Sequence, residues 1–215
     1  QERFRYDIMQ MILEAPDAAT AFILHDYWGK LAGADHFEVK SQNYSPNATS
    51  VEGFVYIFKA PARGEEGWDC ENLPIDSTPE SLAGKLLVEY HQLVADDVDQ
   101  NSWHAVTNKA ESLALFKKRF PFIKVGYEQK DGASYYTDTL SVVSDDMIKK
   151  FTGIQIMQTC HPQAGHGADI GDAKGGREKG DLNRELAAGE NRQCAMKTAI
   201  LLNKKPRPAS MTMVH

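Results

Sequence analysis

The chain has 215 residues, of which 42% are hydrophobic and 25% are charged, a composition typical of one globular domain rather than a disordered protein. Its net charge of -6 argues against binding to nucleic acid or to an anionic membrane surface, because both require a basic surface. No apolar run reaches the roughly 18 to 20 residues that a transmembrane helix needs. The sequence therefore predicts a soluble, acidic protein that does not span a membrane.

The three cysteines are Cys70, Cys160 and Cys194, an odd number at wide spacing. A secreted disulfide scaffold usually has an even number at closer spacing, so we expect reduced thiols, which favours an intracellular compartment. The triplet that begins at Asn47 is a glycosylation acceptor pattern and favours the opposite interpretation. The sequence leaves the compartment open.

The N-terminal third is predicted to hold two helices and a hairpin. Apolar residues recur at helical spacing over 4–15 and again over 17–33, which indicates two amphipathic helices. Two runs rich in β-branched and aromatic residues, 37–44 and 51–60, predict a pair of antiparallel strands. The proline-rich stretch 61–79 is expected to be a long surface loop.

Two more helices are predicted in the middle of the chain. Ser77 or Thr78 caps a predicted helix that begins at Pro79, and residues 79–94 carry an apolar stripe typical of such a helix. Asn108 and Glu111 form a capping box that predicts a second helix, which ends at Arg119 because Pro121 prevents its continuation.

A second hairpin is predicted around Asp131-Gly132. Two β-rich runs flank this dipeptide between 119 and 143, and Asp-Gly in that position is a strong signal for a tight hairpin turn. In the register that such a turn imposes, one face is apolar except for Asp138. We therefore expect a half-buried antiparallel pair of strands.

The C-terminal part begins with a short predicted helix over 144–151 and a strand over 153–159. Another helix is expected to begin at Asp181, whereas 194–203 fits either a helix or a strand. The last residues, 204–215, are basic and contain prolines, and they are expected to form an extended tail.

The stretch Cys160 to Asp181 is rich in glycine and is the best candidate for chemistry in the sequence. As a phosphate-binding loop it would use Gly165 and Gly167 for backbone contact, with His161, His166, Lys174 and Arg177 as further ligand-binding side chains. The glycine spacing differs from that of a dinucleotide-binding turn, and no helical pattern starts inside the stretch. The competing interpretation is an exposed glycine-rich loop with no ligand.

The same stretch contains four side chains that are able to bind a metal ion: Cys160, His161, His166 and Asp169. Their spacing matches neither of the well-attested zinc patterns, C-x-x-C or H-E-x-x-H. Cys160 is also a candidate nucleophile if a histidine lies beside it in space. The sequence identifies no cofactor.

Together these patterns predict an α+β fold with an antiparallel sheet of five or six strands, including two hairpins, and helices packed mainly on one face. We expect one domain over 1–203 and a tail over 204–215. For function, the first hypothesis is a noncatalytic protein that binds a small ligand or docks onto a protein partner, as an oligomer or assembly subunit, through its long loops and tail. The alternative is an enzyme, a metal-assisted hydrolase or a transferase for a phosphate-bearing ligand, that uses the 160–180 loop.

Overall fold

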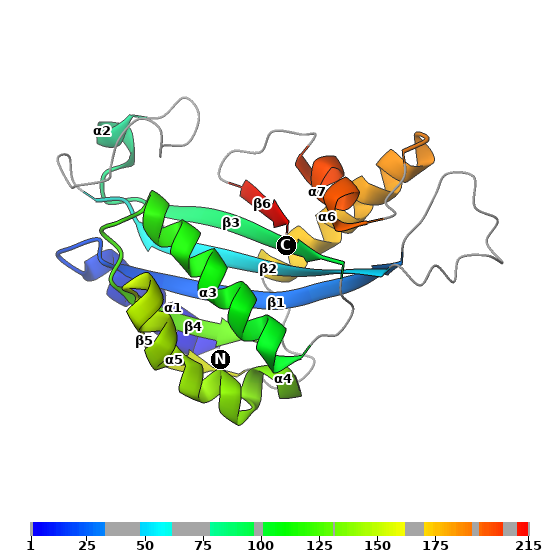
Figure 1. Cartoon of the computed structure of the whole chain (residues 1–215). Coiled ribbons are helices and arrows are strands. Elements are labelled where there is room, and N and C mark those ends of the chain that lie inside the picture. Colours follow the sequence, from blue (N-terminus) through cyan, green and yellow to red (C-terminus); the bar gives the residue numbers. More distant parts are fainter. Residues whose placement is uncertain are drawn as a thin grey trace.

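The computed structural model describes residues 2–32, 48–61, 78–96, 101–130, 132–161, 170–190, 194–203 and 210–214. Within these residues the chain forms a six-stranded sheet with strand order β5-β4-β1-β2-β3-β6 (Figure 1). The strands are β1 (Thr20–Ala32), β2 (Ala48–Lys59), β3 (Leu86–Ala95), β4 (Val125–Lys130), β5 (Gln155–Cys160) and β6 (Ser210–Val214). The helices are α1 (Glu2–Glu14), α2 (Pro79–Leu82), α3 (Ser102–Arg119), α4 (Ser134–Thr137), α5 (Thr139–Thr152), α6 (Ile170–Ala187) and α7 (Ala195–Asn203).

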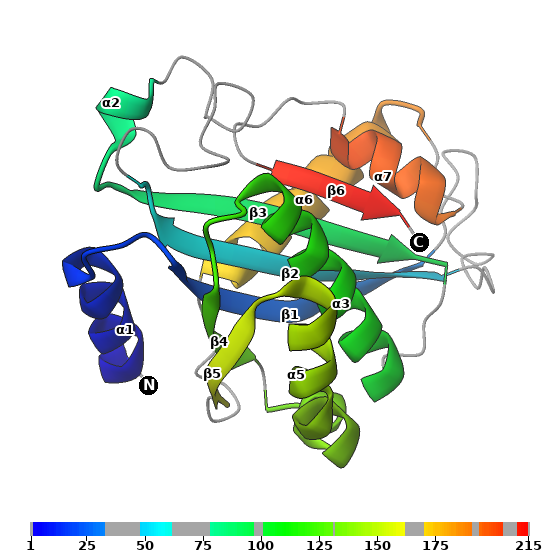
Figure 2. The same cartoon turned by 60° about the vertical axis from the view of Figure 1, so that its left-hand side comes forward.

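The sheet is mixed, so the prediction of a purely antiparallel sheet is wrong. Strands β1, β2 and β3 form an antiparallel meander, whereas β4 is parallel to β1, β5 is parallel to β4, and β6 is parallel to β3. The chain runs from β3 to β4 through α3 and from β4 to β5 through α5. Such helical crossovers let neighbouring strands run in the same direction. Figure 2 shows β6 alongside β3.

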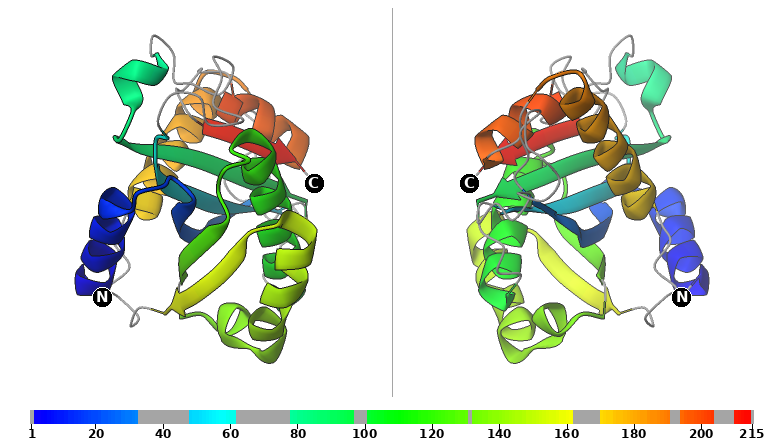
Figure 3. Two further views of the ribbon diagram at one scale, coloured as in Figure 1. Left: turned by 90° about the vertical axis from the view of Figure 1, so that its left-hand side faces the viewer. Right: turned by 90° about the vertical axis from the view of Figure 1, so that its right-hand side faces the viewer.

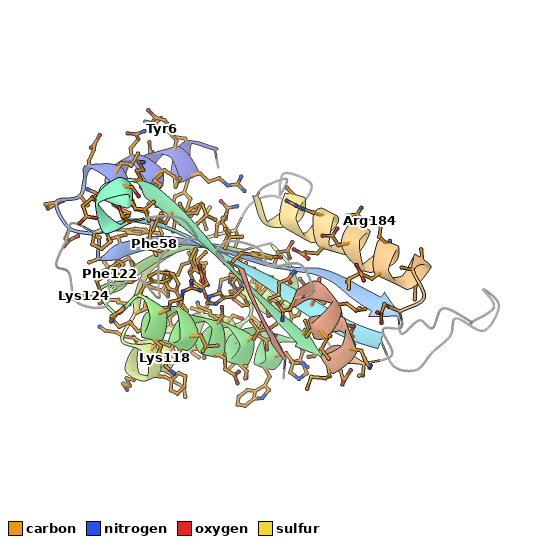
Figure 4. The ribbon with its side chains drawn as sticks, turned by 90° about the horizontal axis from the view of Figure 1, so that it is seen from above. Tyr6, Phe58, Lys118, Phe122, Lys124 and Arg184 are labelled. Carbon is orange, nitrogen blue, oxygen red and sulfur yellow. The ribbon has the colours of Figure 1, made fainter. Side chains whose placement is uncertain are left out.

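Helices cover both faces of the sheet, which corrects the expectation that they lie mainly on one face. Helix α3 lies on one side, and α1 and α6 lie on the other, as the views in Figures 3 and 4 show. Phe58 and Phe122 lie between the sheet and α3, where they belong to the largest cluster of buried apolar side chains. A separate cluster, which includes Ile12 of α1 and Phe22 of β1, fills the opposite side.

Two predicted helices are strands. Residues 17–33 include β1, and residues 79–94 include most of β3, with only the one-turn helix α2 before it. Consecutive residues are buried in both strands, 21–25 in β1 and 89–94 in β3, so neither strand shows the apolar-polar alternation of a strand with one covered face. After α2 the chain turns at Gly84, whose φ of 75° lies in the left-handed region that favours glycine.

The hairpin predicted around Asp131-Gly132 does not form. Strand β4 ends at Lys130, and the chain then continues into α4 and α5 instead of returning as a strand. Asp138, the polar exception in the predicted strand, is the N-cap of α5, and its carboxylate accepts a hydrogen bond from the backbone N–H of Ser141 at 2.9 Å. The helix ends at Gly153, which has a φ of 75°.

Other predicted elements are confirmed. These are the first helix, the strand at 51–60, the helix that ends at Arg119 and the strand at 153–159. Helix α3 begins earlier than expected, because Asn101 rather than Asn108 is its N-cap. Residues 194–203, left open by the sequence, contain helix α7, whereas the predicted strand 37–44 lies outside the described residues.

Candidate functional site

The residues predicted to carry chemistry are only partly described. Cys160 is the last residue of β5, with a free, half-buried thiol, and the next residue, His161, is exposed. Gly165, His166, Gly167 and Asp169 lie outside the described residues. Whether the predicted metal ligands or phosphate-binding groups converge therefore stays a prediction. Within the described ranges, no three His, Cys, Asp or Glu side chains are placed so that they could hold a metal ion.

Helix α6 begins at Ile170, so the second half of the predicted glycine-rich loop is helical. This corrects the expectation that no helix starts inside that stretch. Lys174 and Arg177 belong to α6, and the Arg177 side chain is exposed. The helix therefore constrains the backbone at two of the predicted ligand-binding positions.

The most unusual site in the described structure is a group of charged side chains buried between the sheet and helices α3 and α5. We call it the charged cluster, and its members are His25 of β1, Glu52 of β2, Lys109 of α3, Glu128 and Lys130 of β4, and Asp145 of α5. All of these except Asp145 are buried, and 28% of the Asp145 side chain is exposed. Six ionisable groups in one core are uncommon, because burying a charge is unfavourable unless the charge is paired.

Strand register brings the cluster together. In the parallel pair, Ile23 of β1 lies beside Glu128 of β4, and His25 lies beside Lys130. Since alternate residues of a strand share a face, His25, Glu128 and Lys130 all point toward α3. The cluster lies at the carboxyl end of β4 and beside the middle of the longer strand β1, where the pairing of these two strands ends.

His25 lies between two carboxylates. Its Nδ1 atom is 3.2 Å from Glu52 Oε1, and its Nε2 atom is 2.9 Å from Glu128 Oε1. The Glu52 carboxylate also accepts hydrogen bonds from the Tyr136 hydroxyl and from Asn108 Nδ2, both at 2.8 Å. A doubly protonated, positively charged imidazole ring fits this position, because a carboxylate oxygen lies within 3.2 Å of each ring nitrogen.

Glu128 is the centre of the remaining contacts. Lys109 Nζ lies 2.9 Å from its carboxylate, Lys130 Nζ lies 3.2 Å from it, and Thr159 of β5 donates a hydrogen bond at 3.0 Å. Lys109 also forms an ion pair at 2.7 Å with Asp145. One lysine therefore joins the sheet, helix α3 and helix α5.

The surroundings of these groups change their pKa values. Burial alone would lower the pKa of His25, but the neighbouring Glu128 and Glu52 carboxylates together raise it above the ordinary 6.5. Burial alone would raise the pKa of Glu128, but Lys109, His25 and Lys130 hold it well below 4.5. With His25 protonated, the cluster has three cations and three carboxylates, so its charges balance.

A second group of buried polar side chains lies between the sheet and α3, where a serine contacts a histidine and the histidine contacts a glutamate. The Ser112 hydroxyl is 2.6 Å from the Tyr56 hydroxyl and 3.0 Å from His91 Nδ1, and His91 Nε2 is 3.6 Å from Glu89 Oε1. A nucleophilic serine needs this order of groups, but it also needs access to a substrate. Ser112 and His91 are both 0% exposed, so the group is a buried hydrogen-bonded link between the sheet and α3.

Helix α5 exposes apolar side chains and buries polar ones. Val143, Met147 and Phe151 are 58%, 70% and 68% exposed, and their spacing of four residues places them along one side of the helix. We call these three residues the α5 apolar face. The buried residues of the helix are Ser141, Ser144, Ile148 and Thr152. This pattern reverses that of an ordinary surface helix.

The sequence interpretation missed both features. Glu128 and Val143 both fall within the hairpin predicted between 119 and 143. The helix predicted over 144–151 includes Met147 and Phe151, but α5 begins earlier, at Thr139, because the Asp131-Gly132 turn pattern assigned 119–143 to a hairpin. No local pattern marks the charged cluster, because its members come from five separate elements.

Among the described helices, none combines the length and the apolar character that crossing a membrane would require. No model of a protein family matches this chain, and no curated protein has a significantly similar sequence.

Proposed function

We propose that this chain is a noncatalytic protein that docks onto a protein partner through the α5 apolar face. The observation that carries the proposal is the reversed polarity of α5, in which Met147 and Phe151 are about two-thirds exposed while Ser141 and Ser144 are buried. Single exposed apolar residues are common on protein surfaces, but a contiguous row of them marks an interaction site.

The energetics of burial support a docking role. Complete burial of a Val, Met or Phe side chain contributes about 1.5 to 3 kcal/mol relative to full exposure. The three side chains of the α5 apolar face are already more than half exposed, so a partner would recover much of this free energy. Met and Phe are also enriched in the cores of protein interfaces.

The charged cluster supports the same proposal because it fixes α5 in place. The Lys109 ammonium group bridges Glu128 in the sheet and Asp145 on α5. Asp138 caps the start of the helix, and Gly153 ends it. A helix held at both ends and at its middle loses little conformational entropy on docking, which favours binding.

The long loop 61–79, the stretch 160–180 and the tail 204–215 remain part of the proposal as further contact segments, for a small ligand or for the partner, although residues 210–214 of the tail form β6 and pair with β3. Most of their residues lie outside the described structure, so α5 supplies the support for docking.

Site-specific photocrosslinking tests the proposal. A photoreactive amino acid replaces Met147, and the matched control carries it at Met196 of α7, which is also apolar and 57% exposed. In an extract of the producing cells, we expect one partner, identified by mass spectrometry, to crosslink at position 147 and not at 196. Adding Phe151→Glu should abolish that crosslink. Equal crosslinking at both positions, or none at 147, would overturn the proposal.

A second candidate function is an enzyme that uses the 160–180 stretch. The observation that favours it is the hydrogen bond from Thr159 to Glu128, which places the start of this stretch beside the charged cluster. Calorimetric titration with Zn²⁺ and with inorganic phosphate tests it. Binding that is lost in His161→Ala would support this function, and no heat of binding for either ion would count against it.

A further inference from the structure

The charges beside the α5 apolar face have a particular arrangement. Asp146 and Lys150 are both exposed. They are four residues apart, so they lie on the same side of the helix, one turn from each other. At 100° per residue, both lie on the flank of the apolar face that points away from the buried residues Ser144 and Ile148.

The charges on this flank are complementary to the same charges on a second α5 helix that runs in the opposite direction. In an antiparallel pair related by a two-fold axis, each flank of one helix faces the same flank of the other. Reversing the direction places Asp146 of one copy beside Lys150 of the second copy, and the symmetry repeats the pair. Two reciprocal ion pairs then lie along one side of the contact.

The apolar residues fit the same arrangement. Met147 lies midway between Val143 and Phe151, so a two-fold axis near Met147 places the small Val143 opposite the large Phe151 of the second copy. Large and small side chains on opposite helices interdigitate better than two large ones. Figure 1 shows α5 on the outside of the molecule, next to α3, where a second helix has room to approach.

We infer that the partner docked on the α5 apolar face is a second copy of this chain, paired through two antiparallel α5 helices. The inference rests on the proposed function and names its partner. The apolar face covers on the order of a few hundred Å² per copy, less than the roughly 800 Å² per partner of a standard interface. Both copies also have a net charge of -6. We therefore expect a weak dimer with a Kd of about 10 to 100 μM.

A charge-swap experiment tests the pairing. In Asp146→Lys, two lysines of one copy face two lysines of the other, and in Lys150→Asp the facing groups are all acidic. Each variant alone should dimerise at least about ten-fold more weakly than the original chain. Mixed together, they should form a heterodimer of about the original affinity, because every facing pair is again of opposite charge. Sedimentation velocity from about 5 to 500 μM measures all three states.

The outcomes separate the inference from the proposed function. A chain that stays monomeric at 500 μM, or single variants that dimerise as well as the original, would overturn the second-copy inference. If Met147 then still crosslinks to a different protein, the docking proposal stands with another partner. Phe151→Glu should abolish the dimer without loss of helical circular dichroism, which excludes unfolding as the cause. Failure of the mixed variants to associate would overturn the antiparallel arrangement.

Discussion

The charged cluster and the α5 apolar face lie on the same side of the sheet, and both reverse the usual distribution of residues. In the cluster, charges are buried, and each lies within ion-pair distance of an opposite charge in the same chain. On α5, the apolar side chains of Met147 and Phe151 are exposed to solvent, whereas polar residues of the same helix are buried. The buried charges of the cluster have their partners within one molecule. The exposed side chains of the α5 apolar face would lose their contact with water only if another surface covered them.

The difference shows how the two regions contribute to stability and to binding. Removing one member of a buried ion pair leaves the other charge uncompensated in a low-dielectric core. Removing an exposed apolar side chain leaves the folded molecule almost unchanged, because that side chain has few contacts to lose. Substitutions in the cluster should therefore change folding, and substitutions on the α5 apolar face should change association.

The largest effect is expected for Glu128→Ala. It leaves Lys109, Lys130 and His25 without their shared carboxylate, so the free energy of unfolding should fall by about 3 to 5 kcal/mol. Urea denaturation followed by circular dichroism measures the change. The control is Glu14→Gln, an exposed carboxyl group, which should stay within about 0.5 kcal/mol of the original chain. Similar stability for both variants would show that the cluster contributes nothing to folding.

A smaller effect is expected on α5 itself, where two adjacent apolar residues differ in burial. Ile148 is 2% exposed and Met147 is 70% exposed. Ile148→Ala should lower the free energy of unfolding by about 2 to 4 kcal/mol, because it opens a cavity in the core. Met147→Ala should change it by less than about 0.5 kcal/mol. Both are measured in dilute protein, so that self-association does not contribute, and equal losses would contradict the orientation of the helix.

The sequence predicted much of the architecture. The strand at 51–60 was readable because its apolar run is too dense for one covered face, and β2 indeed lies between β1 and β3. The end of α3 was readable because Pro121 lacks the N–H that a continuing helix requires. In both cases the deciding signal is local.

The errors have a common physical cause, because tertiary pairing outweighed local preference. Asp131-Gly132 favours a hairpin, but β4 has β1 and β5 as neighbours, both parallel, and no position beside it is left for a returning strand. The charged cluster was out of reach for the same reason. Glu52 contacts Asn108 and Tyr136, which are 56 and 84 residues away, and no pattern within one element records such contacts.

The pH dependence of stability should separate the two regions further. The pKa of His25 is raised in the folded state, so its stabilising effect is complete below pH 6.5 and is lost as the pH rises through the folded-state pKa. The pKa of Glu128 is lowered, so its stabilising effect is present above pH 4.5 and is lost as the pH falls through its folded-state value. We expect maximum stability between about pH 4.5 and 6.5, with a loss of up to about 1.4 kcal/mol per pH unit above that range.

Nitrogen NMR of the His25 ring gives an independent measurement of this pH effect. Both ring nitrogens should keep their protons to a higher pH in the folded protein than in the unfolded chain, where a histidine has a pKa near 6.5. Substitutions on the α5 apolar face should leave this signal unchanged. A His25 ring that loses its proton at a lower pH in the folded protein than in the unfolded chain would contradict the charge balance of the cluster.

The smallest effect is expected at two glycines with few neighbours, Gly176 inside α6 and Gly189 in the turn that follows it. A Cβ atom added at Gly176 or at Gly189 would meet no atom within 4 Å, but only Gly189 has a positive φ, of 100°. Gly176→Ala should therefore raise the free energy of unfolding by about 0.4 to 1 kcal/mol, because alanine loses less backbone entropy in a helix. Gly189→Ala should lower it by about 1 to 2 kcal/mol, because an L-residue is strained at that φ. Thermal melts of the two variants provide the comparison.

These changes in the free energy of unfolding come from the backbone alone. They are the reference for the larger losses expected from substitutions in the charged cluster. A gain for both variants would show that the chain around residue 189 is free to change its conformation, and a loss for both would contradict the helical state of residue 176.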